Sequence, residues 1–270
     1  MSSYRIIIAI GLLWVLTAAS WALPTITMET APIVEQFHAG VLTDDDGNTL
    51  PFRLFIPKME PGQSYPLLLF LHGSGENARD NVKQLRRVVT LLTPDAVQQR
   101  YPHFILAPQL AFGQAWSASE AYMGSKAQAP ITSGMRLAMA LIFAIQRQFP
   151  SIDHDRLYLG GLSSGASGTW DFIERQPDLF AAAIPVSGSG DAGKAGRLVH
   201  LPIWAFHGAN DIITLPSTTT TMIEAITKAG GHPRMTLFSD AGHRTWDKVF
   251  TDPTVLAWLF TQHRTVHHPQ

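Results

Sequence analysis

A serine between two glycines is the clearest candidate for chemistry in this chain. The pentapeptide G-L-S-S-G spans residues 161–165, after a short apolar run at 156–160 and before a stretch with helical character at 167–175. A strand that turns sharply into a helix at G-x-S-x-G presents its serine hydroxyl as an exposed nucleophile. The pattern therefore predicts Ser163 as a nucleophile, and the alternative is an ordinary serine on a tight turn.

A serine hydroxyl attacks a carbonyl carbon only when a base removes its proton, and a third group must orient that base. Two later segments could supply these groups. Residues 206–211 leave an apolar run and indicate Asp211 as the acid, and residues 237–243 leave the last expected strand and indicate His243 as the base. The alternatives are that Asp211 caps the next helix and that His243 is a surface histidine.

Other acids and histidines follow the serine but are less well placed. Asp191 lies in a flexible glycine- and serine-rich segment, and Asp240 is so close to His243 in the chain that it could only brace the loop. His232 precedes its expected strand, at the wrong edge of a sheet. The remaining downstream histidines belong to the last helix or the tail: His263, His267 and His268. Their clustering could suggest metal affinity, but we interpret them as a solvated tail and expect no metal.

Acyl transfer also needs backbone N–H donors for the oxygen that gains negative charge. One donor is expected from Ser164, the residue after the nucleophile. The other is expected from the glycine-rich loop at 72–76, where we take Ser74 as the donor; the alternative is a simple glycine turn. His72 and His207 each precede a glycine at the end of an expected strand, and we interpret both as structural hydrogen-bonding residues.

The elements expected around these residues alternate between strand and helix. Apolar runs and turn signals indicate strands at 34–42, 51–56, 67–71, 104–107, 156–160, 181–186, 203–206 and 234–238, and helices at 81–99, 135–148, 167–175, 217–229 and 253–262. The first two strands are joined by a turn cluster at 44–48 that is typical of a hairpin. Alternation of this kind predicts an α/β fold with a mostly parallel twisted sheet, helices on both faces and an antiparallel hairpin at its N-terminal edge.

Composition and length fit one catalytic domain. The chain has 270 residues, of which 46% are hydrophobic, and a formal net charge of -1. One α/β domain can reach roughly 250 residues. The near-neutral charge gives no electrostatic reason to expect nucleic acid binding. Because the chain has no cysteine, disulfides, thiolate metal sites and cysteine nucleophiles are excluded.

The N-terminus has the pattern of an export signal. Residues 1–5 carry one positive charge, residues 6–19 are almost wholly apolar, and Ser20 and Ala22 are small residues at the positions that signal peptidase inspects. We therefore expect a signal peptide at 1–22, a catalytic domain at 23–270, and a periplasmic or secreted protein without stable membrane insertion. The alternative is an uncleaved anchor, because the apolar stretch at 6–23 approaches spanning length.

Five blocks of sequence together carry a family resemblance. They lie at 71–76, at 107–109, at 161–165 with 168–171, at 206–208 with Asp211, and at 242–243 with Trp246. In this order they resemble the secreted α/β-hydrolase esterases related to polyhydroxybutyrate depolymerases, feruloyl and acetylxylan esterases, and the predicted-peptidase group near prolyl oligopeptidase. The chain departs from many of these sequences at Ser164, where a bulky Met or Gln is common, and in lacking the cysteine pairs of some relatives.

The resemblance implies a serine hydrolase that acts on small or polymeric carboxylic esters without a metal or cofactor, with Ser163, Asp211 and His243 as its catalytic triad. Two alternatives remain open: a serine peptidase of the prolyl-oligopeptidase type, and a non-catalytic binding protein on the same fold.

Aromatic residues near these motifs could bind a sugar or phenolic ring. Trp116, Tyr122 and Met123 fall in a long irregular stretch at 110–133, which we expect to form a lip or partial lid. Trp170 and Trp246 lie beside triad residues in the sequence. The alternative is that such side chains fill the core, and for Trp170 we favour it.

Overall fold

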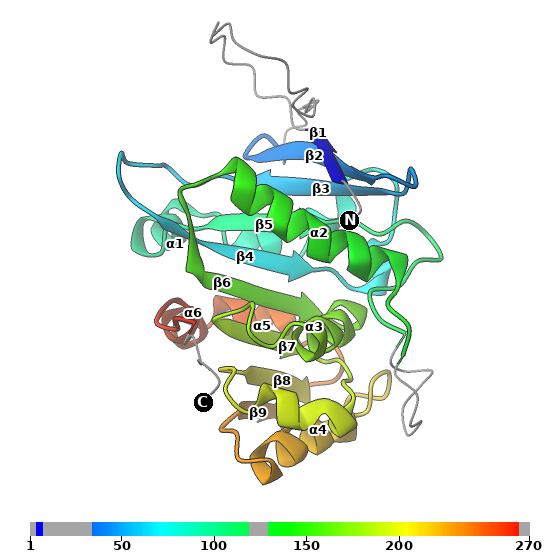
Figure 1. Cartoon of the computed structure of the whole chain (residues 1–270). Coiled ribbons are helices and arrows are strands. Elements are labelled where there is room, and N and C mark those ends of the chain that lie inside the picture. The colour runs from blue at the N-terminus through cyan, green and yellow to red at the C-terminus, as the bar shows by residue number, and fades with distance from the viewer. Residues whose placement is uncertain (1–3, 8–33, 119–128, 265–270) are drawn as a thin grey trace, which may run out of the picture.

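A computed structural model describes residues 4–7, 34–118 and 129–264, and in this part of the chain one nine-stranded sheet carries helices on both faces (Figure 1). The strand order is β1-β2-β3-β5-β4-β6-β7-β8-β9. The strands are β1 (Tyr4–Ile7), β2 (Phe37–Asp44), β3 (Thr49–Phe55), β4 (Tyr65–Leu71), β5 (Phe104–Pro108), β6 (Ile152–Leu162), β7 (Ala182–Val186), β8 (Trp204–Gly208) and β9 (Arg234–Phe238). The strands from β4 to β9 are mutually parallel, so the predicted sheet is confirmed.

The hydrophobic core forms two layers because successive side chains of a strand point to opposite faces of the sheet. In β4, Leu67 and Leu69 pack in one layer, and Leu68 and Phe70 pack in the other. All seven residues of β4 are buried, as expected for a parallel strand covered on both faces. The first layer is completed by α2 (Ser133–Gln148), α3 (Ser164–Arg175) and α4 (Pro216–Lys228), and the second by α5 (Trp246–Thr251) and α6 (Pro253–Phe260). Figure 1 shows α2 and α3 on the near face.

The predicted N-terminal hairpin is present. β2 pairs antiparallel with β3, and β3 pairs antiparallel with β5, which joins the hairpin to the parallel strands. The Asp44 carboxylate accepts hydrogen bonds from the N–H groups of Asp46 and Asn48, and Gly47 takes a φ of 79° between them. An aspartate that bonds the backbone two residues on is a common way to close a turn.

The predicted signal peptide lies mostly outside the described residues. Only Tyr4–Ile7 belongs to it, as β1, paired antiparallel with β2 at the edge of the sheet. The export signal therefore stays a prediction. Among the helices that the structure describes, none combines the length and apolarity required to cross a bilayer.

The prediction of a single helix at 81–99 is wrong. Two short 3₁₀ turns, Lys83–Leu85 and Val89–Leu91, precede the helix α1 (Asp95–Arg100). Pro94 stands at the N-terminal boundary of α1, where its missing N–H and its ring prevent one continuous helix. The apolar residues that suggested a long helix still pack in the second core layer. The helix α5 was not expected either.

Candidate active site

Ser163 lies on a strained turn between β6 and α3. Its backbone has φ 54° and ψ −123°, a left-handed conformation that residues other than glycine rarely adopt. The turn is held by a 2.9 Å hydrogen bond from Ser163 N to the Val186 carbonyl, and Ser163 O accepts from Ala166 N at 2.8 Å. This geometry places the side chain of Ser163 at the N-terminus of α3, beyond the carboxyl end of β6.

Two glycines allow α3 to approach the sheet at this turn. A Cβ on Gly165 would lie 2.0 Å from the Leu71 carbonyl oxygen, and one on Gly161 would lie 2.3 Å from the Gly165 carbonyl oxygen. Neither contact is tolerable, and both involve backbone that cannot swing away. The glycines therefore bring the nucleophile turn against the end of β4, where the glycine-rich loop begins.

The structure brings Ser163, His243 and Asp211 together. His243 Nε2 lies 2.8 Å from Ser163 Oγ, and His243 Nδ1 lies 2.7 Å from Asp211 Oδ2. A carboxylate only accepts hydrogen bonds, so the proton of the neutral imidazole resides on Nδ1 and Nε2 is free to accept the serine proton. This is the arrangement in which a histidine acts as general base toward a serine.

Asp211 is held as a carboxylate by several donors. Its side chain is fully buried, and its Oδ1 accepts from the N–H groups of Ile213 and Thr214 at 2.9 and 3.0 Å. Burial works to raise the pKa of Asp211, but the hydrogen bonds from His243, Ile213 and Thr214 outweigh it and hold the pKa below its usual value. Asp211 therefore stays ionised while it orients His243.

The acid and base loops are joined by backbone contacts. Ala209 N donates to Phe238 O, and Asn210 N donates to Ala241 O, both at 2.9 Å. A Cβ on Gly208 would lie 2.1 Å from the Gly242 carbonyl oxygen. The absence of a side chain at Gly208 thus allows the end of β8 to pack directly against the loop that carries His243.

The two expected oxyanion donors lie on neighbouring loops. Ser74 begins a 3₁₀ turn, η1 (Ser74–Glu76), after β4, and Ser164 is the first residue of α3. Within the described part of the chain, neither backbone N–H donates to a protein acceptor. An N–H group without a protein acceptor is the kind of donor that the expected oxyanion role of Ser74 and Ser164 requires.

His72 fixes the loop that carries Ser74, as interpreted from the sequence. Its ring Nδ1 lies 2.7 Å from Gly73 O, and its Nε2 accepts from Leu110 N at 3.0 Å. Burial lowers the pKa of His72 to about 4, although the bond to Gly73 works the other way, so the ring is neutral. The Trp116 indole N–H donates to the His72 carbonyl at 2.9 Å.

The aromatic residues proposed from sequence as binding surfaces are largely internal. Trp116 and Trp170 are 1% and 0% exposed, so neither offers a face to a ligand. Trp116 packs edge-on to His72, and Trp170, on α3, belongs to the first core layer. Trp246 is also buried, with its ring edge-to-face to His243 at 5.7 Å. Tyr122 and Met123 lie outside the described residues.

One link between the oxyanion loop and the base was not seen in the sequence. Glu76, in η1, is buried and accepts a hydrogen bond from Arg87 Nε at 2.6 Å. The Arg87 guanidinium lies 5.4 Å from the centre of the Trp246 ring, which in turn contacts His243. The spacing of these four residues gives no sequence signal, because the contacts depend on how the segment at 76–87 packs against the start of α5.

The rival acids take structural roles. Asp191 caps a 3₁₀ helix through Gly193 N, and Asp240 pairs with Lys248 at the surface. His232 is exposed. His267 and His268 lie outside the described residues. Among the residues that the structure describes, no group of three or more histidine, aspartate or glutamate side chains could hold a metal ion.

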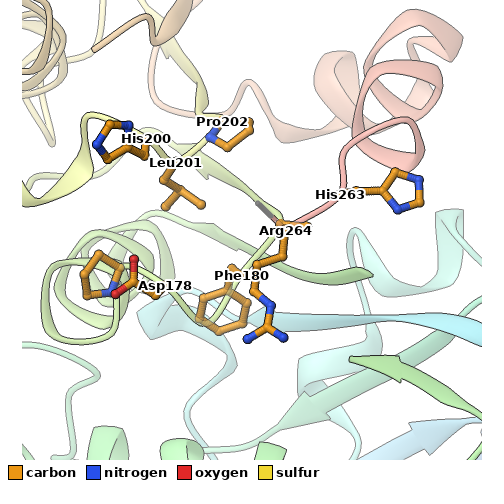
Figure 2. A pocket seen from close by; sticks show the side chains of 9 residues that line it. Asp178, Phe180, His200, Leu201, Pro202, His263 and Arg264 are labelled. Atoms are coloured by element: carbon orange, nitrogen blue, oxygen red, sulfur yellow. The ribbon is translucent and has the colours of Figure 1, made fainter. Parts of the chain in front are cut away.

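His263 lines a small hollow far from Ser163. Asp178, His200 and Arg264 also line it (Figure 2), and its volume is about 20 Å³. It lies near the starts of β7 and β8, at the amino edge of the sheet, whereas Ser163 follows the carboxyl end of β6. The hollow is therefore separate from the triad.

Comparison with known proteins gives structural matches. No family model and no curated protein sequence matches the chain. A thermostable esterase matches with a TM-score of 0.80 and 32% identity over 86% of this chain and 64% of the esterase, so the chain spans less than two thirds of that protein. A ferulic acid esterase matches with a TM-score of 0.61 and 16% identity over 79% and 92% of the two chains. An acylaminoacyl peptidase from Pyrococcus horikoshii matches with a TM-score of 0.60 and 13% identity over 87% and 43%.

These matches and the sheet order define the chain as an α/β hydrolase by fold. The resemblance to α/β-hydrolase esterases, first noted on short motifs, is confirmed by the match to the thermostable esterase. The matches below 25% identity, which include the peptidases, show the fold alone.

Proposed function

We propose that this protein is a serine carboxylesterase that hydrolyses carboxylic esters through an acyl-enzyme on Ser163. The observation that carries the proposal is the continuous hydrogen-bonded path from Ser163 Oγ through His243 to Asp211, with distances of 2.8 and 2.7 Å. The esterase of 32% identity supports the same assignment.

The reaction proceeds in two stages. His243 Nε2 takes the Ser163 proton as Oγ attacks the ester carbonyl carbon, and the N–H groups of Ser74 and Ser164 stabilise the oxygen that becomes negative. His243 then gives its proton to the leaving alcohol, which leaves the acyl group on Ser163. Water repeats the sequence with His243 as base, and the acid is released. Asp211 stabilises the imidazolium in both stages.

Substitution of the nucleophile tests the proposal. Ser163→Ala should lower the hydrolysis of a short p-nitrophenyl ester by about a thousandfold or more, because the covalent step is lost. Ser151→Ala, a serine just before β6 and at the opposite edge of the sheet, is the matched control. Thermal melting should show both variants folded. If Ser163→Ala keeps its activity, Ser163 is not the nucleophile.

A peptidase is the second candidate, because several structural neighbours are peptidases. A p-nitrophenyl ester and a p-nitroanilide with the same acyl group separate the two functions. Because an activated ester is cleaved by both kinds of enzyme, the anilide decides, and we expect turnover of the ester with no measurable turnover of the anilide. Steady turnover of the anilide would favour a peptidase, and a fluorophosphonate probe that fails to label Ser163 would favour a non-catalytic binding protein.

We also propose that the protein is exported and acts in the periplasm or outside the cell. The support is the charge and apolar pattern of residues 1–22. When the full chain is expressed in a bacterium, the exported product should begin at Leu23 by mass spectrometry. Ala22→Trp should block this cleavage, because signal peptidase requires a small residue there. A full-length product in the membrane fraction would favour the anchor instead.

A further inference from the structure

His207 is a second imidazole that contacts the triad acid. It lies near the carboxyl end of β8, and its side chain is fully buried. Its Nε2 is 3.1 Å from Asp211 Oδ2 and 2.9 Å from the Thr214 carbonyl oxygen. Its Nδ1 is 2.7 Å from Thr219 Oγ1, on α4. Both ring nitrogens therefore have polar partners although the ring has no contact with solvent.

These partners fix the position of one proton. The Asp211 carboxylate and the Thr214 carbonyl can only accept hydrogen bonds, so His207 Nε2 must carry a proton and donate it. Thr219 Oγ1 can serve either form of the ring. A hydroxyl can donate to Nδ1 or accept from it, and Thr219 Oγ1 also lies 3.1 Å from Gly188 O. In both forms, Nε2–H points at Asp211.

The oxygen that His207 contacts is the one that orients the base. Asp211 Oδ2 accepts from His243 Nδ1 at 2.7 Å and from His207 Nε2 at 3.1 Å, whereas Oδ1 accepts from the backbone N–H groups of Ile213 and Thr214. Without His207, the backbone bonds would still hold Oδ1. Oδ2 would have one donor, His243, and the carboxylate could rotate about its bonds to the loop.

Thr219, the partner of His207 Nδ1, lies close to a segment that packs against α3. Thr219 Oγ1 lies 3.1 Å from the Gly188 carbonyl, in the segment that follows β7. A Cβ on Gly188 would lie 2.5 Å from Ala166 Cβ, so this segment packs against the first turn of α3. Thr219 thus lies between His207 and the segment that packs against α3.

We propose that His207 is a positioning residue of the triad, which holds the Asp211 carboxylate so that Oδ2 faces His243. The proposal rests on the proposed esterase function, since it assigns a role within that site. His207 acts through Asp211 and touches neither Ser163 nor a substrate.

Two amide substitutions form a matched pair for the test. In His207→Gln, the amide nitrogen occupies about the position of Nε2 and can still donate to Asp211. In His207→Asn, the amide reaches Thr219 but is too short to reach Asp211. We expect His207→Asn to lower kcat for a p-nitrophenyl ester roughly 10- to 100-fold with KM within about twofold, the loss typical of one hydrogen bond to a charged group. We expect His207→Gln to stay within about threefold of the wild type.

A double-mutant cycle distinguishes positioning from general damage. In an Asp211→Asn background, His207→Asn should change kcat by less than about threefold, because the carboxylate that it positions is gone. Equal loss in both backgrounds, equal loss in the Gln and Asn variants, or normal kcat in His207→Asn would overturn the proposal. If neither His207 variant folds, Thr219→Val and Thr219→Ser decide instead: Val should lower kcat and Ser should restore it, and equal rates would overturn the proposal.

The failure of this inference can be separated from the failure of the proposed function. If the wild type hydrolyses no ester, the esterase function fails. The same variants are then compared by the rate at which a fluorophosphonate labels Ser163, a reaction that needs an activated serine and no ester substrate. Slower labelling in His207→Asn than in His207→Gln would still support positioning by His207, and equal rates would overturn it.

Discussion

Ser163 shows how a strained residue is maintained by its surroundings. A residue other than glycine in this conformation costs on the order of 1–3 kcal/mol. The bond from Ser163 N to Val186 O and the start of α3 at Ser164 fix the backbone on both sides. The strained backbone thus holds Oγ 2.8 Å from His243 Nε2, which is the geometry that the proposed attack requires.

The acid of the triad gives a prediction for a single side chain. Asp211→Asn should lower ester turnover about 10⁴-fold, because an amide N–H facing His243 would favour the tautomer with its proton on Nε2, which cannot accept from serine. Steady-state hydrolysis of a p-nitrophenyl ester measures the effect. Asp240→Asn, at the surface near the base loop, is the control and should retain activity. An active Asp211→Asn variant would place the acid elsewhere.

At the scale of elements, the site depends on loops that pack without side chains between them. The acid loop after β8 and the base loop after β9 meet at Gly208, whose hypothetical Cβ overlaps the Gly242 carbonyl oxygen. The atoms that a methyl group on Gly208 would meet are backbone carbonyl oxygens, so the methyl group can be accommodated only if the two loops separate. Asp211 and His243 lie on these two loops. If the loops separate, the distance between Asp211 Oδ2 and His243 Nδ1 increases.

Gly208→Ala should therefore impair both stability and catalysis. We expect a loss of roughly 1–3 kcal/mol in the free energy of unfolding from overpacking, and a fall in turnover of the order of 10²-fold, since a displacement of about 1 Å in a site can cost that much. Gly196→Ala is the matched control, because a Cβ there meets no atom within 4 Å. Urea denaturation and ester kinetics measure the two effects. Wild-type turnover in Gly208→Ala would show that the loops tolerate separation.

The contact between α3 and the 3₁₀ helix η5 (Ala192–Leu198) gives a prediction about pH. Burial raises the pKa of Glu174 to about 7, against the opposing effects of Asp191 N–H and the Lys194 ammonium. In the unfolded chain the carboxyl has its ordinary pKa of 4.5. The folded state therefore favours the protonated form, and this contribution to stability is full below pH 4.5 and is lost as the pH rises through 7.

Glu174→Gln should remove this dependence. The free energy of unfolding of the variant minus that of the wild type should increase by about 3 kcal/mol between pH 4.5 and pH 8, whatever its value at low pH. Melting curves across this range measure the difference. Glu224→Gln, on the exposed side of α4, is the matched control for loss of a surface carboxylate. A difference for Glu174→Gln that stays constant with pH would contradict the prediction.

For the whole molecule, sequence patterns predicted the features that follow from general rules. Buried parallel strands are continuous apolar runs, so β4 and its neighbours could be predicted from the sequence. The candidate acid and histidine were then chosen because they follow the serine in the chain and lie after the carboxyl ends of expected strands. Contacts between distant side chains carry no such pattern: the edge-on packing of Trp116 against His72 and the contact of Arg87 with Trp246 depend on the folded geometry. The prediction of one helix at 81–99 was wrong because it followed the apolar spacing and neglected Pro94, which interrupts a helix.

Two buried histidines make the stability of the whole fold sensitive to acid. Burial lowers the pKa values of His72 and His103 to about 4, although bonds to the carbonyls of Gly73 and Tyr101 work the other way. The unfolded chain, in which each histidine has its ordinary pKa of 6.5, takes up these two protons first as the pH falls. The histidines thus favour unfolding increasingly between pH 6.5 and 4, while Glu174 has the opposite effect and involves one proton.

The free energy of unfolding should therefore decrease as the pH falls from 6.5 to about 4.5. His103→Asn isolates one contribution, because the amide can still donate to Tyr101 O but does not titrate. The stability of this variant minus that of the wild type should rise by about 3 kcal/mol as the pH falls through this range, opposite in direction to Glu174→Gln. His232→Asn, at an exposed position, is the control. Chemical denaturation at each pH measures both slopes, and parallel curves for His103→Asn and the wild type would show that His103 takes up its proton equally in both states.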